Sequence, residues 1–272
     1  MGKLLNGAEL AGYIKERQAR QVRGLIQAHG VTPKLAVVQT KDDPVINSYV
    51  SLKGRYAADI LVELERFVVP QTEARELIER LNGDSSVHGI IIQLPLADPA
   101  ETDELINLVV SHKDVDALSL NAPYDPATAL AINWLLAGYN VTLDGKRIVI
   151  VGNGKLVGAP LAKMWRNSGH DVVVLDAETS EADFLHELRR ADIVASGIGV
   201  PGRITADMIA PGAVVVDAGV ATEGKTLRGD LDPTIYERDD IAVTPAKGGV
   251  GPLTVCALFD NVIRAAREPV QN

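Results

Sequence analysis

Short apolar runs alternate with longer amphipathic stretches along the whole chain. The runs are rich in Val and Ile and have the length of buried strands, while apolar residues in the stretches recur three or four positions apart, as on one face of a helix. We expect strands at residues 35–40, 62–67, 89–94, 147–151, 171–175, 192–195, 213–216 and 240–243. We expect helices at residues 8–28, 47–58, 74–81, 128–137 and 252–267. This alternation predicts an α/β fold of parallel sheets with helices packed on their faces.

A stretch rich in turn-forming residues, 121–126, separates the first series of elements from the second. A length of 272 residues fits one or two domains. We therefore expect two α/β lobes that meet near residue 122. The final helix could return to the first lobe, which would make that lobe discontinuous in sequence.

The composition excludes several classes of protein. With 46% hydrophobic and 23% charged residues, the chain has the balance of a globular protein. The formal charge of −9 and an aromatic content of 4% argue against nucleic acid or a membrane as partner. No apolar run approaches the roughly 20 residues of a membrane helix. The single Cys256 and the scattered histidines predict neither a disulfide nor a metal site, and they favour the cytoplasm.

A glycine-rich loop follows the expected strand at 147–151 and precedes a helical pattern. It contains Gly152, Gly154 and Gly158, in the order Gly-Asn-Gly-Lys-Leu-Val-Gly. In this context the backbone can approach a phosphate closely, and the helix N-terminus offers unpaired N–H groups. The spacing is one residue longer than the usual dinucleotide fingerprint, so a plain strand-to-helix turn is the alternative.

Asp176 follows the next expected strand. An acid at the tip of the second strand of such a lobe can bind the ribose 2′-hydroxyl of a dinucleotide. Its charge would repel a 2′-phosphate, so Asp176 favours NAD over NADP. The alternative is a turn or helix-capping role before Thr179 and Ser180.

Three polar side chains stand out in the first lobe. Tyr49 and Lys53 lie four positions apart on an expected helix and so leave from one face, although such a pair usually has no chemical role. Gln93 lies near the end of an apolar strand, where a buried amide needs partners and where parallel sheets bind ligands.

Two further segments have both a functional and a plain interpretation. Lys113-Asp-Val-Asp116 places two acids before the boundary between the lobes, or forms a solvated charged loop. The segment 247–254 has three glycines that allow close approach to a planar ligand or a moving lid. It could equally be an ordinary helix start with Pro252 in the first turn.

Taken together, these segments resemble the methylenetetrahydrofolate dehydrogenase/cyclohydrolase family of one-carbon metabolism. The matching pieces fall in the family's order and cover nearly the whole chain. They are residues 44–53, 89–96, 113–116, 157–160, 191–193 and 248–254.

The resemblance implies two α/β lobes with a cleft between them and usually a homodimer. The N-terminal catalytic, folate-binding lobe would comprise residues 1–122 and be completed by the C-terminal helix in 252–272. Residues 123–251 would form a Rossmann-type NAD(P)-binding lobe.

The resemblance also implies roles for single residues. Lys53 corresponds to the catalytic lysine, Gln93 to the partner that orients it, and Tyr49 and Asp116 to residues that hold the pterin. Further folate contacts would come from Gly249, Pro252, Leu253 and Thr254. The cofactor would contact Gly152, Asn153, Gly154, Lys155, Val157, Gly158, Asp176, Gly197 and Val220.

The implied activity is oxidation of 5,10-methylenetetrahydrofolate with NAD(P), followed by hydrolysis of the methenyl product to 10-formyltetrahydrofolate. Several positions depart from the family. Asn153-Gly154 and Asp176-Ala177 replace its usual Arg-Ser and His-Ser, which removes groups suited to a 2′-phosphate and again favours NAD. Near the expected folate contacts, the departures are Ile46, Ala117, Leu118-Ser-Leu120 and Lys247.

These departures leave two alternatives open. One is a dehydrogenase without hydrolysis, or a diverged NAD-dependent oxidoreductase on the same scaffold. The other is a non-catalytic protein that binds folate or a nucleotide. Retention of Tyr49, Lys53, Gln93 and Asp116 indicates that pterin chemistry survives. Lys53 counts against a loss of hydrolysis, while the altered residues 117–120 leave that alternative open.

Overall fold

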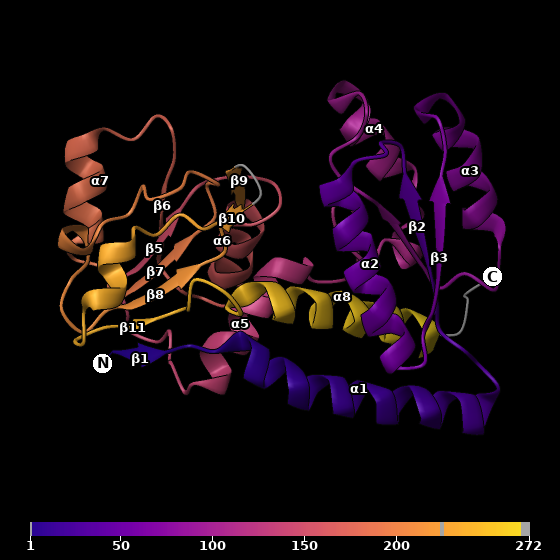
Figure 1. Ribbon diagram of the computed structural model, residues 1–272, viewed down its shortest axis with the longest axis horizontal. Helices are drawn as coiled ribbons and strands as arrows, with labels where there is room; N and C mark the ends of the chain where they lie inside the picture. Colours follow the sequence, from indigo (N-terminus) through magenta and orange to yellow (C-terminus); the bar gives the residue numbers. More distant parts are fainter. Residues whose placement is uncertain (1, 224–225, 268–272) are drawn as a thin grey trace. The chain divides into compact units, whose positions relative to one another are not determined.

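The computed structural model describes residues 2–223 and 226–267 and divides into two compact units (Figure 1). One contains the chain up to Ala11 together with Thr128–Thr254, and we call it the glycine-loop unit. The other contains Gly12–Ala127 and the chain from Val255 on, and we call it the lysine unit. The last residues of the expected catalytic lobe, 268–272, lie outside the described residues.

The lysine unit is built on a parallel sheet in the order β3-β2-β4. Its strands are β2 (Lys34–Gln39), β3 (Glu63–Val68) and β4 (Gly89–Ile92). Its helices are α2 (Pro44–Asp59), α3 (Gln71–Gly83) and α4 (Thr102–Leu108), with 3-10 turns η1 (Pro99–Glu101) and η2 (Ser111–Lys113). Val38 of β2, Ile90 of β4 and Ile78 of α3 are fully buried in one apolar cluster. Strand β3 lies at the sheet edge and is largely exposed.

The glycine-loop unit is built on a six-stranded sheet in the order β1-β11-β8-β7-β5-β6, and all its strand pairs are parallel. The strands are β1 (Lys3–Leu4), β5 (Ile148–Val151), β6 (Val172–Leu175), β7 (Ile193–Ser196), β8 (Val214–Asp217) and β11 (Ala242–Val243). Other elements are α6 (Gly158–Asn167), α7 (Glu181–Leu188), the antiparallel pair β9 (Ala221–Glu223) and β10 (Thr226–Arg228), η3 (Ala206–Met208) and η4 (Pro233–Glu237).

Each unit has its own apolar core. In the glycine-loop unit, Val149, Val194 and Val215 lie side by side on neighbouring strands and are fully buried. Burying one such side chain contributes roughly 1.5–3 kcal/mol, so a layer of three is a substantial part of the unit's stability. The β-branched runs that predicted strands are therefore also the centre of the core.

Three helices contain or adjoin the boundaries between the units. They are α1 (Gly7–His29), α5 (Ala127–Gly138) and α8 (Val250–Arg267). The boundaries fall after Ala11 in α1 and after Thr254 in α8, while α5 enters the glycine-loop unit at Thr128.

All strands and helices expected from the sequence are present, with ends shifted by a few residues. The structure adds α4, α7, β1, β9 and β10, which are too short to show a period in the sequence. Strand β1 pairs with β11, so the first residues of the chain join the sheet of the glycine-loop unit. The division expected near residue 122 had assigned them to the first lobe.

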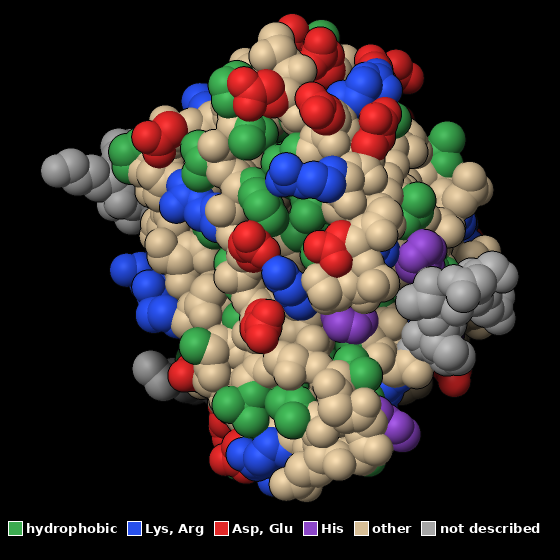
Figure 2. Space-filling model, turned by 90° about the vertical axis from the view of Figure 1, so that its right-hand side faces the viewer, with side chains coloured by type: hydrophobic (Ala, Val, Ile, Leu, Met, Phe, Trp, Pro, Cys, Tyr) green, Lys and Arg blue, Asp and Glu red, His purple; other side chains and the backbone are tan. Residues whose placement is uncertain are grey.

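Charged side chains of both signs are interspersed on the face shown in Figure 2. Exposed ion pairs between such side chains contribute about 0–1 kcal/mol each, so most of the stability comes from the apolar cores. In residues 2–223 and 226–267, no helix combines the length and apolar character needed to cross a membrane.

Candidate active site

Lys53 and Gln93 meet in the lysine unit. Helix α2 has a fixed start, because the Asp43 side chain accepts hydrogen bonds from two backbone N–H groups of its first turn. Gln93 directly follows β4, and its Nε2 donates to the Leu94 carbonyl. The amide is thereby held with Oε1 towards the lysine, whose Nζ donates to it over 2.9 Å. A neutral acceptor holds the amine in place without adding charge.

The charge balance around Lys53 favours proton transfer. Burial lowers the pKa of Lys53 below its ordinary value, and the nearby charge of Asp116 opposes part of that shift. Burial raises the pKa of Asp116, with a further increase from Asp114 and an opposing effect from Lys53. Within the described residues, no hydrogen-bond donor contacts the Asp116 carboxylate. A lysine that loses its proton more easily can act as a base, and the carboxylate is available to a ligand.

The other members of the 113–116 segment are structural. Lys113 is only 4% exposed, so it is not part of a solvated loop. Its Nζ donates to three backbone carbonyls at the C-terminal end of α3, those of Leu81, Asn82 and Asp84. Asp114 is also buried, and its carboxylate accepts from the Ser119 N–H. Of the two acids, only Asp116 thus remains for the site.

Ala117 follows Asp116 in a strained backbone conformation. Its φ is 56°, in the left-handed region that glycine adopts readily and that costs a residue with a Cβ about 1 kcal/mol. The chain therefore makes this turn with a residue that carries a Cβ, at a position where glycine would meet no such strain.

Tyr49 lies one helical turn before Lys53 on α2. The side chain is 36% exposed, and partial burial raises the pKa of its hydroxyl. An accessible ring one turn from the partly buried Lys53 is suited to line a pocket for a flat ligand.

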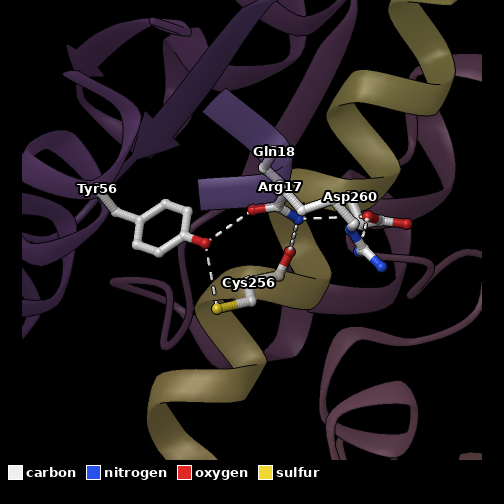
Figure 3. A network of polar contacts seen from close by, with 5 residues as sticks. All are labelled: Arg17, Gln18, Tyr56, Cys256 and Asp260. Carbon is white, nitrogen blue, oxygen red and sulfur yellow. Dashed lines mark hydrogen bonds and ion pairs between the residues drawn. The ribbon is translucent and has the colours of Figure 1, made fainter. Parts of the chain in front are cut away.

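A polar network also fixes α2, through Tyr56 in the turn after Lys53 (Figure 3). The Tyr56 hydroxyl lies 2.7 Å from Gln18 Oε1 of α1 and 3.1 Å from Cys256 Sγ of α8. Gln18 Nε2 in turn donates to the Cys256 carbonyl, and the Tyr56 ring stacks on Phe259. The sequence analysis did not identify this network. It ties α2, which carries Tyr49 and Lys53, to two other helices of the lysine unit.

The glycine loop has the shape that phosphate binding requires. Gly152 has a φ of 103°, and a Cβ at Gly158 would lie 1.8 Å from the Gly152 carbonyl oxygen, so packing requires both glycines. A Cβ at Gly154 would meet nothing within 4 Å, so packing does not explain that glycine. No side chain caps the start of α6. A close-approaching backbone and an uncapped helix N-terminus fit a dinucleotide.

The carboxyl ends of β5, β6 and β7 bring three expected cofactor residues together. The Gly152 N–H donates to the carbonyl of Leu175, next to Asp176, and the Gly197 N–H donates to that of Val151. Asp176 also has the turn role considered above, because its Oδ1 accepts from the Glu178 N–H. Val220 follows β8 at the same edge and is exposed.

The C-terminal glycine segment packs against the start of α1 in the glycine-loop unit. A Cβ at Gly7 would lie 1.9 Å from the Gly249 carbonyl oxygen. Leu253 is fully buried, while Pro252 and Thr254 are partly exposed. The described residues contain no group of three or more metal-binding side chains placed to hold an ion.

Comparison with known proteins identifies both parts of the chain. Residues 5–116 match the catalytic domain of tetrahydrofolate dehydrogenase/cyclohydrolase, and residues 126–270 match its NAD(P)-binding domain. The bifunctional protein FolD of Amoebophilus asiaticus is 36% identical over 100% of this chain and 99% of its own length.

Two solved structures are similar over almost their whole length. The bifunctional enzyme FolD of Campylobacter jejuni has a TM-score of 0.91 at 31% identity, covering 98% of this chain and 99% of that one. The Trypanosoma brucei dehydrogenase-cyclohydrolase, solved with NADP and an inhibitor, has a TM-score of 0.92 at 27% identity, covering 100% and 99%. The chain therefore belongs to the tetrahydrofolate dehydrogenase/cyclohydrolase family.

Proposed function

We propose that the protein is an NAD-preferring bifunctional enzyme that oxidises 5,10-methylenetetrahydrofolate and hydrolyses the methenyl product to 10-formyltetrahydrofolate. Membership of the family supports the two activities and a nicotinamide cofactor. The observation that carries the proposal for this chain is the hydrogen bond from Lys53 to Gln93 beside Asp116. The preference for NAD, the residue roles and a homodimer in the cytoplasm are parts of the proposal.

The first step requires positioning more than acid–base chemistry. The methylene carbon lies between two nitrogens, so loss of hydride leaves a delocalised cation that needs no proton transfer. A bound nicotinamide would accept that hydride. The chain's part is to hold the folate, with Asp116 accepting hydrogen bonds from the donor-rich pterin edge and Tyr49 lining the ring. We assign additional folate contacts to the 249–254 segment, with Leu253 acting through its backbone because its side chain is buried.

The second step uses the lysine. Water attacks the methenyl carbon, and the bond from that carbon to N5 breaks to give the 10-formyl product. We assign to Lys53 the transfer of one proton from the attacking water to the leaving nitrogen, while the second proton of the water is released to solvent. The lowered pKa of Lys53 favours this role. Gln93 keeps the amine in one position throughout, which is why a neutral, fixed partner suits the task.

The preference for NAD rests on Asp176 and on the loop before it. Gly152 and Asp176 follow neighbouring parallel strands, so an adenosine ribose bound over the glycine loop would lie near the carboxylate. Asp176 Oδ1 already accepts from a backbone N–H, and the second oxygen can accept from a ribose hydroxyl. A 2′-phosphate there would face the negative charge. Asn153 and Gly154 supply no cation to offset it.

Initial-rate measurements test the proposal. 5,10-methylenetetrahydrofolate is supplied with NAD or NADP, and reduced nicotinamide and the methenyl product are followed together. Faster turnover with NAD, without methenyl accumulation beyond the spontaneous balance, supports the whole proposal. Turnover with accumulating methenyl would indicate a dehydrogenase alone, and no turnover with either cofactor would overturn it.

A further inference from the structure

Two aspartates at the carboxyl edge of the glycine-loop sheet have no part in the function described above. Asp217 ends β8, and Asp230 lies in the segment after β10. Asp230 is 0% exposed, and no cation among residues 2–223 and 226–267 forms an ion pair with it, which is rare for a carboxylate buried so deeply. A buried carboxylate needs hydrogen-bond donors around it. The segments that supply these donors show which part of the fold the carboxylate holds in place.

In the part of the chain that the structure describes, the donors to Asp230 come from the end of β7 and the loop that follows it. Its Oδ2 accepts from the Ser196 hydroxyl over 2.6 Å and from the Ile198 N–H over 2.9 Å. Its Oδ1 accepts from the Val200 N–H over 2.9 Å. The carboxylate therefore fixes the loop on both sides of Gly197 and again two residues later.

The same loop packs directly on the glycine loop. A Cβ at Gly197 would lie 2.6 Å from a methyl carbon of Val157, and a Cβ at Gly152 would lie 2.7 Å from a methyl carbon of Ile198. Neither contact leaves room for the 197–200 loop to move inward. A shift of this loop would thus be felt at Gly152 and Val157, two of the proposed cofactor contacts.

Asp217 holds Asp230 in turn. Its Oδ1 accepts from the backbone N–H groups of Gly219 and Asp230, and its Oδ2 accepts from that of Leu231. A Cβ at Gly219 would overlap the Asp230 carboxylate, with atoms 2.2 Å apart. The two acids thereby join the loops after β7 and β8 to the segment after β10, and the loop after β8 contains Val220.

We propose that Asp230 is a positioning residue for the nicotinamide cofactor, holding the 197–200 loop where Gly197 and the glycine loop can contact the dinucleotide. The inference rests on the proposed function, because Gly197, Gly152 and Val157 are cofactor contacts only within it. The chemistry explains the residue type. A carboxylate accepts at both oxygens, whereas an amide would turn an NH₂ group towards one of the three donors.

The test is Asp230→Asn in the full-length protein, with two readouts. The dissociation constant for NAD, measured by fluorescence of the reduced form or by calorimetry, should rise about tenfold, as expected for one lost charge-assisted bond. Hydrolysis of preformed 5,10-methenyltetrahydrofolate involves no redox change and needs no cofactor, and it should stay within about twofold. A general loss of folding would instead weaken NAD binding and slow hydrolysis together.

Asp232→Asn is the matched control. Asp232 lies two positions away and caps η4 through the Thr234 N–H. Among the described residues, its side chain forms hydrogen bonds with Thr234 and none with the 197–200 loop. It should lose some stability but keep its affinity for NAD. If Asp230→Asn does not fold, Ser196→Ala removes one of the three donors and is judged by the same two readouts.

The outcomes separate this inference from the proposed function. A wild-type protein that binds neither NAD nor NADP would overturn both. A functional wild type whose Asp230 variant binds NAD unchanged, or loses hydrolysis in parallel with binding, would overturn the positioning role alone.

Discussion

Lys53 donates a 2.9 Å hydrogen bond to Gln93, a residue that lies 40 positions away in the sequence and directly after a buried strand. The bond places the amine next to Asp116, whose charge acts on the lysine from a different segment. The lysine is therefore subject to two opposing influences, burial and a neighbouring acid. The balance between them can be shifted by mutation.

Asp116→Asn should move the pH dependence of hydrolysis towards lower pH. The Asp116 charge raises the pKa of Lys53 against the larger effect of burial, so removing the charge lowers that pKa further. If neutral Lys53 is the base, the hydrolysis rate increases with pH as Lys53 loses its proton. This ascending limb of the pH–rate profile should therefore move to lower pH together with the pKa of Lys53. The measurement is the pH–rate profile at saturating methenyltetrahydrofolate, since the variant also loses a folate contact. A limb that moves to higher pH would contradict the assignment.

Asp176→Ser should relax the discrimination against NADP. Serine keeps an acceptor for the turn that Asp176 forms with Glu178 but removes the charge. We expect the ratio of kcat/KM for NAD to that for NADP to fall by about tenfold, the equivalent of about 1.4 kcal/mol. An unchanged ratio would leave Asp176 with its turn role alone.

Ala117→Gly should stabilise the protein. The φ of 56° costs alanine about 1 kcal/mol, and glycine relieves this cost while gaining freedom in the unfolded chain, so we expect a net gain of roughly 0.5 kcal/mol. Chemical denaturation measures it. Ala19→Gly, in the middle of α1, is the control and should destabilise by about 1 kcal/mol. A loss of stability in both variants would show that Ala117 bears no strain.

Asp217→Asn should change how stability depends on pH. Burial, with a smaller contribution from Asp230, raises the pKa of Asp217 to about 6 against three backbone N–H groups that lower it. Between its ordinary value of 3.8 and about 6, the folded state holds a proton that the unfolded state has released. Stability from this group is therefore complete below that range and is lost as pH rises through it.

Asparagine has no such titration. The unfolding free energy of Asp217→Asn minus that of the wild type should thus increase by up to about 3 kcal/mol from pH 4 to pH 7. Denaturation curves at several pH values give this difference, and any constant effect of the substitution cancels. A difference that is flat with pH would mean that Asp217 is not protonated in the folded protein near pH 5.

The sequence predicted the elements that position the site, because they are the ones with a clear period. Continuous runs such as Val149 to Val151 are buried on both faces, and Lys53 is on a helix long enough to show its amphipathic spacing. Strand β1 has two residues, so only its pairing with β11 makes it a strand. The 113–116 segment reads as a solvated loop, yet tertiary contacts bury Lys113 under the end of α3.

The positioning aspartates escaped the sequence analysis for a related reason. Asp230 lies among turn-forming residues, where aspartate is common, and only the fold shows that its partners come from the loop after β7. Asp217 could have been found. Asp217 is the last residue of an apolar strand, much as Gln93 directly follows one. In both cases a polar side chain at the end of a buried strand needs hydrogen-bond partners.

The most direct test of the account is hydrolysis of preformed 5,10-methenyltetrahydrofolate by Lys53→Met, with NAD affinity measured on the same sample. Methionine keeps the length of the side chain but cannot transfer a proton or bond to Gln93. We predict that hydrolysis falls by at least about a hundredfold, towards the spontaneous rate, while the NAD dissociation constant is unchanged. Hydrolysis close to that of the wild type would contradict the central claim that this lysine carries the second reaction.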